Sequence, residues 1–189
     1  MKKIIVCLVF IVICTGFNHT IAQESPAYSG MFNVGILYGS NKSKIQAQTI
    51  HGLQYRGWFA GVGGSIDDYF QQSIPIFLDV RKSILNKPNT PFVYVDGGIN
   101  LVTKGTKDDW RKVEMKAGVF YEGGLGYKIA VAEKLALNLA AGYSAKTYTQ
   151  NTFFKRTIPT PPYFTDDWTQ SNKEDFNLQR FVMKIGLQF

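Results

Sequence analysis

The chain of 189 residues is poor in cysteine and in charge, and it has no long hydrophobic run. Its two cysteines, Cys7 and Cys14, lie near the N-terminus, so the remainder has neither a disulfide framework nor a thiol nucleophile. The longest apolar run, residues 4–14, is shorter than the roughly 20 residues that a membrane-spanning helix needs. Although the formal net charge is +7, no Lys/Arg run exceeds two residues, which argues against a nucleic-acid-binding patch.

The first 22 residues have the three parts of a secretory signal peptide. Two lysines follow the first methionine, the apolar run comes next, and Thr20-Ile21-Ala22 ends the segment on a small residue. Cleavage after Ala22 removes both cysteines and leaves residues 23–189 as one domain, which we expect to be exported. An alternative is acylation of Cys14 as a lipoprotein, which the large Ile13 before it disfavours.

Glycine, by contrast, is abundant at 18 residues, and aromatic residues make up 14% of the chain. Apolar side chains occupy every second position over long stretches. In residues 113–129, for example, all four charges fall on even positions. Because successive side chains of a strand point to opposite faces, this pattern predicts β-strands. Eight segments share it: residues 32–38, 47–56, 58–66, 74–81, 92–101, 113–129, 135–146 and 180–189.

The connections between these segments alternate in length. The first, third, fifth and seventh are on average longer than the others, although residues 82–91 fit this alternation poorly. Residues 147–174 are predicted to form the longest loop. In outer-membrane barrels with an even number of strands, both termini lie on the side of the short turns and the longer loops face outside. The sequence therefore predicts an all-β fold, an eight-stranded antiparallel up-and-down transmembrane β-barrel.

Alternation alone does not say which face of the sheet meets solvent, so a secreted lipocalin-like barrel is the alternative. The apolar face carries no charge, and tyrosine and tryptophan occur near strand ends, as in membrane barrels. The other face mixes both signs of charge with glycine, which suits a narrow lumen. The predicted polar network of the lumen comprises Arg56, Asp79, Arg81, Asp96, Glu114, Lys116, Glu122, Lys128, Arg180 and Lys184.

Residues 180–189 end on an aromatic residue after alternating apolar positions, which resembles the terminal signal of Gram-negative outer-membrane barrels. The glycine-aromatic segments 92–100, 123–127 and 141–143 are similar to strands of the small outer-membrane β-barrel family that includes PorT-like proteins and OmpA- and OmpX-type barrels. The resemblance covers residues 28–189 and supplies no shared catalytic motif. The chain lacks the peptidoglycan-binding domain of full OmpA proteins, so a tether to the cell wall is unsupported.

The resemblance implies an outer-membrane location, contact with membrane lipid and lipopolysaccharide, and recognition of the C-terminal strand by the barrel-assembly machinery. The expected role is structural or surface-interacting, without enzymatic activity, cofactor or nucleic-acid partner and with a plugged lumen. Eight strands leave room for side chains, whereas aqueous porins have about 16 to 18. Outer loops are the expected contact with any protein partner. The alternative from another class is an accessory component of a secretion or surface-assembly system.

His51 is the only histidine after the predicted cleavage site. Because small outer-membrane lipid deacylases place a histidine and a serine on the lipid-facing wall, a lipid-modifying enzyme is a further hypothesis. A histidine at the membrane interface is the commoner explanation for a single such residue.

Three aspartate pairs, each followed by an aromatic residue, fall in connections predicted to lie outside. If these loops converged, their carboxylates would suit a divalent cation, because hard cations prefer oxygen ligands. The alternative is that the aspartates keep the loop tips solvated while each aromatic residue anchors the membrane interface, and no metal is assigned. The pairs are Asp67 and Asp68, Asp108 and Asp109, and Asp166 and Asp167.

Overall fold

The computed structural model describes residues 25–39, 43–68, 72–102, 105–160 and 163–189, and the predicted signal peptide lies outside them. No helix in this part of the chain is long and apolar enough to cross a bilayer. The described residues form ten strands: β1 (Ala27–Tyr38), β2 (Lys44–Tyr55), β3 (Trp58–Asp68), β4 (Gln72–Ser83), β5 (Thr90–Val102), β6 (Thr106–Lys107), β7 (Arg111–Lys116), β8 (Gly118–Ala132), β9 (Leu135–Thr160) and β10 (Tyr163–Gln188).

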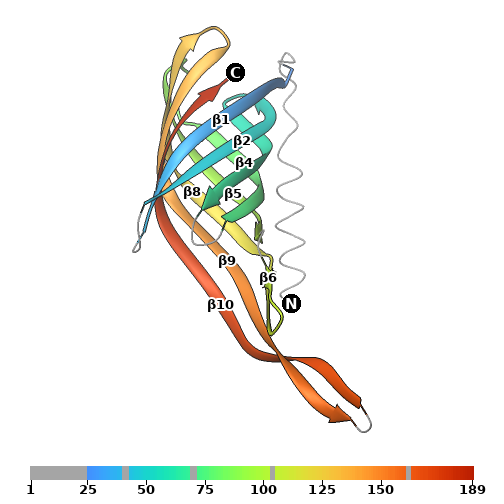
Figure 1. Ribbon diagram of the computed structural model, residues 1–189. Helices are drawn as coiled ribbons and strands as arrows, with labels where there is room; N and C mark the ends of the chain where they lie inside the picture. Colours follow the sequence, from blue (N-terminus) through green and yellow to red (C-terminus); the bar gives the residue numbers. More distant parts are fainter. Residues whose placement is uncertain (1–24, 40–42, 69–71, 103–104, 161–162) are drawn as a thin grey trace, which may run out of the picture.

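Eight of these strands form a closed antiparallel barrel in the order β1-β2-β3-β4-β5-β8-β9-β10, as predicted (Figure 1). The barrel closes where β10 pairs with β1, from Met31 opposite Gln188 to Tyr38 opposite Phe181. Gly30 and the terminal Phe189 extend this seam by two backbone hydrogen bonds of 2.8 and 2.9 Å. Since a closed barrel has no free sheet edge within its wall, every barrel strand has two neighbours.

The two ends of the barrel differ. The start of β1 and the C-terminus lie at one end, here called the terminal end, together with the turns β2–β3, β4–β5 and β8–β9 (Figure 1). Arg56 and Gly57 form the first of these turns with φ of 48° and 74°. Positive φ at both central residues is the geometry of the type I′ hairpin turn, which matches the twist of the strands.

The opposite, far end carries a projecting β-sheet where the sequence predicts a long loop, so that prediction is wrong. Strands β9 and β10 continue past the barrel and pair with each other up to Thr160 opposite Tyr163. Residues 147–160 alone extend about 45 Å at the usual rise per residue. The β6–β7 hairpin packs against this ribbon, with β7 paired to Phe154 and its neighbours on β9. We call β6, β7 and the outer parts of β9 and β10 the projection (Figure 1).

The segment 113–129, predicted as one strand, is interrupted at Ala117. Strands β7 and β8 lie end to end along β9, with Lys116 opposite Thr149 and Phe120 opposite Lys146. Four steps along β7 and β8 therefore correspond to three along β9, which is the one-residue excess of a β-bulge. The bulge reverses the alternation, so the face assignment made for β8 does not apply to β7.

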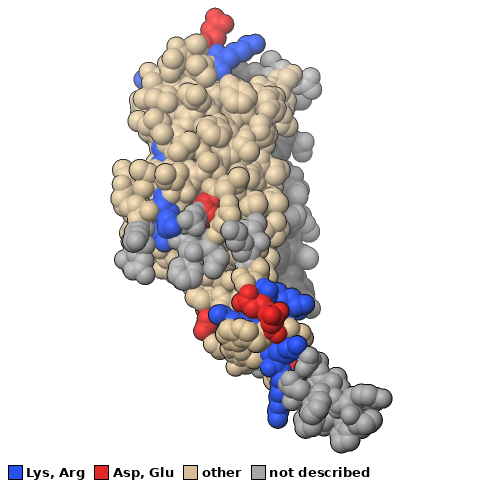
Figure 2. Space-filling model, viewed as in Figure 1, with Lys and Arg blue, Asp and Glu red and all other residues tan. Residues whose placement is uncertain are grey.

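Alternate side chains of the barrel strands separate into an exposed apolar wall and a buried interior. On β4 the apolar residues at even positions, such as Ile76 and Leu78, are exposed, while Phe77 and Asp79 are buried. The same alternation holds on β10, where Met183 and Ile185 are exposed and Lys184 is buried. Few charges interrupt the barrel wall in Figure 2, whereas charged residues gather on the upper part of the projection.

Interior glycines make room for aromatic rings that lie across neighbouring strands. A Cβ on Gly63 would come within 2.5 Å of the Phe77 ring, and one on Gly126 within 2.3 Å of the Phe92 ring. At Gly98 a Cβ would meet the Ile76 carbonyl oxygen at 2.0 Å. The abundance of glycine is thus explained by the close packing of rings and strands in a narrow lumen.

Gly98 and its neighbour Gly97 provide a matched test of this packing. We expect Gly98→Ala to lower the free energy of unfolding by about 1–3 kcal/mol or more, because the added methyl group clashes with backbone. Gly97→Ala should have little effect, since a Cβ there meets nothing within 4 Å. Urea unfolding in detergent micelles, followed by tryptophan fluorescence, measures both. Equal stability of the two variants would contradict the packing argument.

Candidate functional site

The interior contains three groups of paired charges, and the first joins two residues of β4. The Arg81 guanidinium donates to both carboxylate oxygens of Asp79, with Nε 2.9 Å from each and Nη2 2.7 Å from Oδ2. The Arg81 side chain also lies beside the rings of Phe92 and Tyr94, 5.5 and 5.6 Å from their centroids. A bidentate pair of this kind fixes the orientation of both side chains, and the charge of each compensates that of the other.

The second group connects β10 with β8 and β5 across the lumen. The Lys184 ammonium contacts the Glu122 carboxylate directly and lies 3.8 Å from Asp96 and 4.3 Å from the centroid of Tyr94. It also donates to the Gln48 side-chain oxygen at 3.2 Å. One cation thus donates hydrogen bonds to Gln48 on β2 and Glu122 on β8 and makes a longer ion contact with Asp96 on β5, so the group links distant parts of the wall.

The third group lies nearer the far end and joins β9 with β3 and β4. The Lys146 ammonium pairs with the Asp67 carboxylate, and both side chains are almost fully buried. Ser73 completes the group by donating to the other Asp67 oxygen at 2.9 Å. Residues 79 positions apart in the sequence are therefore held together by charge in the interior.

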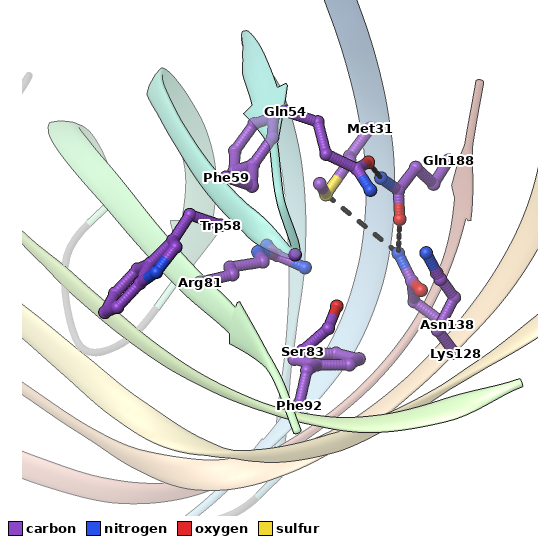
Figure 3. Close-up of a pocket in the computed structure, with 11 residues that line it drawn as sticks. Met31, Gln54, Trp58, Phe59, Arg81, Ser83, Phe92, Lys128, Asn138 and Gln188 are labelled. Atoms are coloured by element: carbon purple, nitrogen blue, oxygen red, sulfur yellow. Dashed lines mark hydrogen bonds between the residues drawn. The ribbon is translucent and has the colours of Figure 1, made fainter. Parts of the chain in front are cut away.

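At the terminal end, amide side chains close over the lumen. Gln188 donates to Gln54 at 3.1 Å and to Ser29 at 3.0 Å, while Asn138 donates to Gln188 at 3.3 Å. Figure 3 shows these amides beside a small cavity that Arg81 also lines. Its volume of about 20 Å³ is enough for about one water molecule.

Seven of the ten residues predicted for the lumen network lie on the inward face of the barrel. Among them, Lys128 lines the small cavity at the terminal end and is only half-buried. The other six are buried in the lumen: Asp79, Arg81, Asp96, Glu122, Arg180 and Lys184.

The remaining three residues lie elsewhere, each for a structural reason. Arg56 occupies the β2–β3 turn, where its guanidinium lies 5.2 Å from the Tyr55 ring centroid. Glu114 and Lys116 belong to β7 in the projection, beyond the bulge, and Glu114 pairs there with Lys112 at 2.5 Å. Polar alternation in the sequence does not show where a barrel ends or where a bulge reverses the faces.

Sequence reasoning missed two charged residues of the interior. The sequence places Asp67 in an outer loop because the predicted strand ends at residue 66, but β3 continues to Asp68 and Asp67 is buried inside the barrel. Lys146 ends the predicted strand 135–146 on its polar face and was not included in the network. The signal for Asp67 was present, because Gly63, Ser65 and Asp67 continue one alternating face.

The structure does not bring the three aspartate pairs together. Asp67 is in the lumen, Asp108 and Asp109 lie exposed in the β6–β7 turn, and Asp167 lies exposed on the outer part of β10. The side chains of Asp68 and Asp166 are outside the described set. Among the described residues, no group of three or more His, Cys, Asp or Glu side chains is arranged to hold a metal ion.

His51 lies on the exposed outer face of β2, near the terminal end. Its Nδ1 is 2.7 Å from the Tyr28 hydroxyl, and its Nε2 is 3.0 Å from the Thr49 hydroxyl. The Tyr28 ring stacks beside it at a centroid distance of 6.2 Å. Both hydrogen bonds recorded for His51 thus join it to threonine and tyrosine, whereas the deacylase hypothesis requires a serine partner.

The fold and the site together define a closed eight-stranded antiparallel β-barrel with an apolar outer wall and an ion-paired interior. No family model and no curated protein matches the sequence. Among solved structures, the chain resembles outer membrane protein AlkL, determined by solid-state NMR in lipid bilayers, with 11% identity, a TM-score of 0.49, and coverage of 92% of this chain and 96% of that one.

It also resembles Neisserial surface protein A, whose crystal structure is known. Identity is 13%, the TM-score is 0.46, and the match covers 87% of this chain and 98% of that one. Likeness at this level says nothing about function. The closed barrel itself is defined by the pairing of the strands.

The Asp67–Lys146 pair offers a test of the interior network. Lys146→Met leaves Asp67 buried without its counter-charge, so we expect a loss of about 3–5 kcal/mol in the free energy of unfolding. The double variant Asp67→Asn with Lys146→Met should cost clearly less, because no uncompensated charge remains. Urea unfolding in micelles provides the values. The single variant Asp67→Asn completes the cycle. If the double variant lost as much as Lys146→Met and Asp67→Asn added together, the pair would not be coupled.

Proposed function

We propose that the protein is a non-enzymatic outer-membrane barrel with a structural or surface-interaction role. The observation that carries the proposal is the inverted distribution of side chains. Leu78, Val95 and Leu125 are each more than 60% exposed on the outer wall, while whole ion pairs are buried inside. In water this arrangement would expose a continuous apolar surface, far larger than the patches of typical soluble monomers. In a bilayer the same surface is solvated by lipid.

The height of the apolar wall supports the proposal. Tyr28 and Tyr38 lie at the two ends of β1 on its outer face, and both are exposed. Ten residues of strand span about 33 Å, which corresponds to about 25 Å across the membrane for the usual strand tilt. This equals the apolar band of known outer-membrane barrels, and aromatic rings border that band in them.

We also propose that the lumen is closed. Within the described part of the barrel, four buried acids face four buried bases, and the one further inward cation, Lys128, is half-buried at the terminal end. Phe77 and Phe120 pack against each other within this space, with ring centroids 5.2 Å apart. The cavity at the terminal end has room for only about one water molecule, which supports a plugged interior rather than an aqueous channel.

A charge placed on the outer wall tests the membrane location. Leu78 lies near the middle of β4, so Leu78→Lys should cost about 2–4 kcal/mol of stability in lipid vesicles. Ile84→Lys is the control, because Ile84 is similarly exposed but lies in a turn at the terminal end. Folding into phosphatidylcholine vesicles, followed by electrophoresis with and without boiling, measures both. A soluble wild-type protein, or a neutral effect of Leu78→Lys, would contradict the proposal.

Planar-bilayer recording tests the closed lumen. We expect the folded wild-type protein to give no large, stable conductance steps, because paired charges and aromatic rings fill the space between the strands. A porin recorded under the same conditions serves as the positive control. Regular steps of uniform size from the purified barrel would show an open aqueous path and overturn the plugged interior.

A further inference from the structure

A slot opens in the barrel wall at the terminal end. It lies where β10 stops at Gln188, while the β8–β9 hairpin and the start of β1 continue on either side (Figure 1). Its volume is about 610 Å³, within the range of about 300–1,000 Å³ that is typical of ligand sites. The lining includes Tyr28 and Ser29 of β1, Lys128 of β8 and Ala136 of β9.

The start of β1 presents a free strand edge to this slot. Gly30 exchanges two backbone hydrogen bonds with Phe189, so its amide and carbonyl groups are directed toward β10. Because these groups alternate sides along an antiparallel strand, those of Tyr28 point the same way, beyond the end of β10. Among the described residues, no strand lies beside Tyr28 on this side. An unpaired edge of this kind can accept an additional strand.

A strand placed in the slot in line with β10 would continue the alternation of its side chains. Gln188 points toward the mouth of the lumen, where it donates to Ser29 and Gln54. Since Gln188 lies opposite Met31, the second residue beyond it would lie opposite Ser29 and would also point inward. The side chain at that position would therefore enter the part of the slot that Lys128 lines.

Lys128 is half-buried at this place and has no carboxylate partner among the described residues. Figure 3 shows it beside the amides of Asn138 and Gln188. The two fully buried lysines of the interior differ from it, because Lys146 and Lys184 each contact a carboxylate. A cation that has lost part of its hydration gains from a nearby counter-charge. The position of Lys128 therefore favours an anionic group in the slot.

The surroundings of the slot carry an excess of positive charge. Among the described residues, the turns and strand ends of the terminal end have five cationic side chains and one carboxylate side chain. With the terminal carboxylate of Phe189 counted as well, five positive charges face two negative ones, an excess of three. This field attracts an acidic ligand toward the slot. The cations are Arg56, Lys82, Lys87, Lys128 and Lys134, and the carboxylate side chain is that of Glu133.

We propose that the slot binds an acidic, extended segment of a partner protein, which adds as a short strand along the start of β1 and places a carboxylate at Lys128. The compartment of this partner rests on the proposed function, because in an outer-membrane barrel the end with both termini faces the periplasm. A lipid headgroup fits less well, since the slot reaches the mouth of the lumen at Gln54 and Gln188. A nucleic acid has no strand edge to pair with β1.

The experiment measures the binding of labelled peptides to the mature chain in phosphatidylcholine nanodiscs, which leave both ends of the barrel accessible. The probe is an acetylated, amidated octapeptide of alternating glutamate and threonine, followed by fluorescence anisotropy. We expect saturable binding that weakens about tenfold or more when glutamine replaces glutamate. Proline in place of every threonine keeps the charge but removes the amides that would face β1, and should also weaken binding about tenfold.

A pair of lysine variants assigns the charge contact. Lys128→Gln with Lys134→Gln should weaken binding of the glutamate peptide about tenfold, because both lysines line the slot. The control, Lys107→Gln with Lys116→Gln, makes the same change of net charge on the projection and should leave binding unchanged. The change in electrophoretic mobility on boiling checks that each variant is folded.

A second pair of variants assigns the strand edge. Tyr28→Pro removes the backbone amide that faces the slot without removing a hydrogen bond to β2, and should weaken binding about fivefold. Tyr28→Phe keeps this amide and removes only the hydroxyl group, so it should bind like the wild type.

The outcomes separate this inference from the proposed function. A wild-type chain that fails to enter the nanodisc, with no change in mobility on boiling, overturns both. A chain that inserts but does not bind the glutamate peptide, or whose slot variants bind like the wild type, overturns only the docking site. Equal binding of the proline peptide would reduce the contact to charge alone and overturn the added strand. Complete displacement of the peptide by phosphatidylglycerol in the nanodisc would assign the cations to lipid and overturn the site as well.

Discussion

The structure depends on the pairing of buried charges inside a barrel of only eight strands. An unpaired charge in such an interior is costly, whereas a paired one links the strands that supply its partners. Lys184 on β10 reaches Glu122 on β8, and Lys146 on β9 reaches Asp67 on β3. Both contacts join strands that are not neighbours in the sheet. They therefore connect parts of the wall that backbone hydrogen bonds do not connect directly.

The space for these charges is shared with aromatic rings, which explains the glycines. Tyr94 shows the connection, because its ring lies 4.3 Å from the Lys184 ammonium and its hydroxyl donates to Glu122 at 3.3 Å. A Cβ on Gly142 would come within 2.5 Å of that hydroxyl. Glycine on the opposing strand is therefore a condition for the ring to lie across the lumen, and the ring in turn helps to hold the cation.

The barrel could be predicted from the sequence because one physical rule, period-two alternation, repeats along almost every strand. Strand ends were harder, since alternation continues through Asp67 while the following aspartate and aromatic residues resemble a loop. Arg56 continues the alternation of polar side chains along the predicted strand, but its positive φ places it in a turn. Residues 147–174 were predicted as a loop because polar residues and prolines obscure the ribbon, whose pairing depends on partners that local sequence does not show.

The bulge at Ala117 accounts for the failed part of the lumen prediction, which placed Glu114 and Lys116 on the inward face. Without it, Lys112, Glu114 and Lys116 would continue the inward face of β8 above the lumen. One extra residue turns them to the other face of the paired strands, beyond the end of the lumen. A buried lysine in the lumen needs a protein carboxylate as its partner, whereas Lys112 in the projection pairs with Glu114 at a partly exposed surface. A single change of register thus decides whether these charges join the ion-paired network of the lumen.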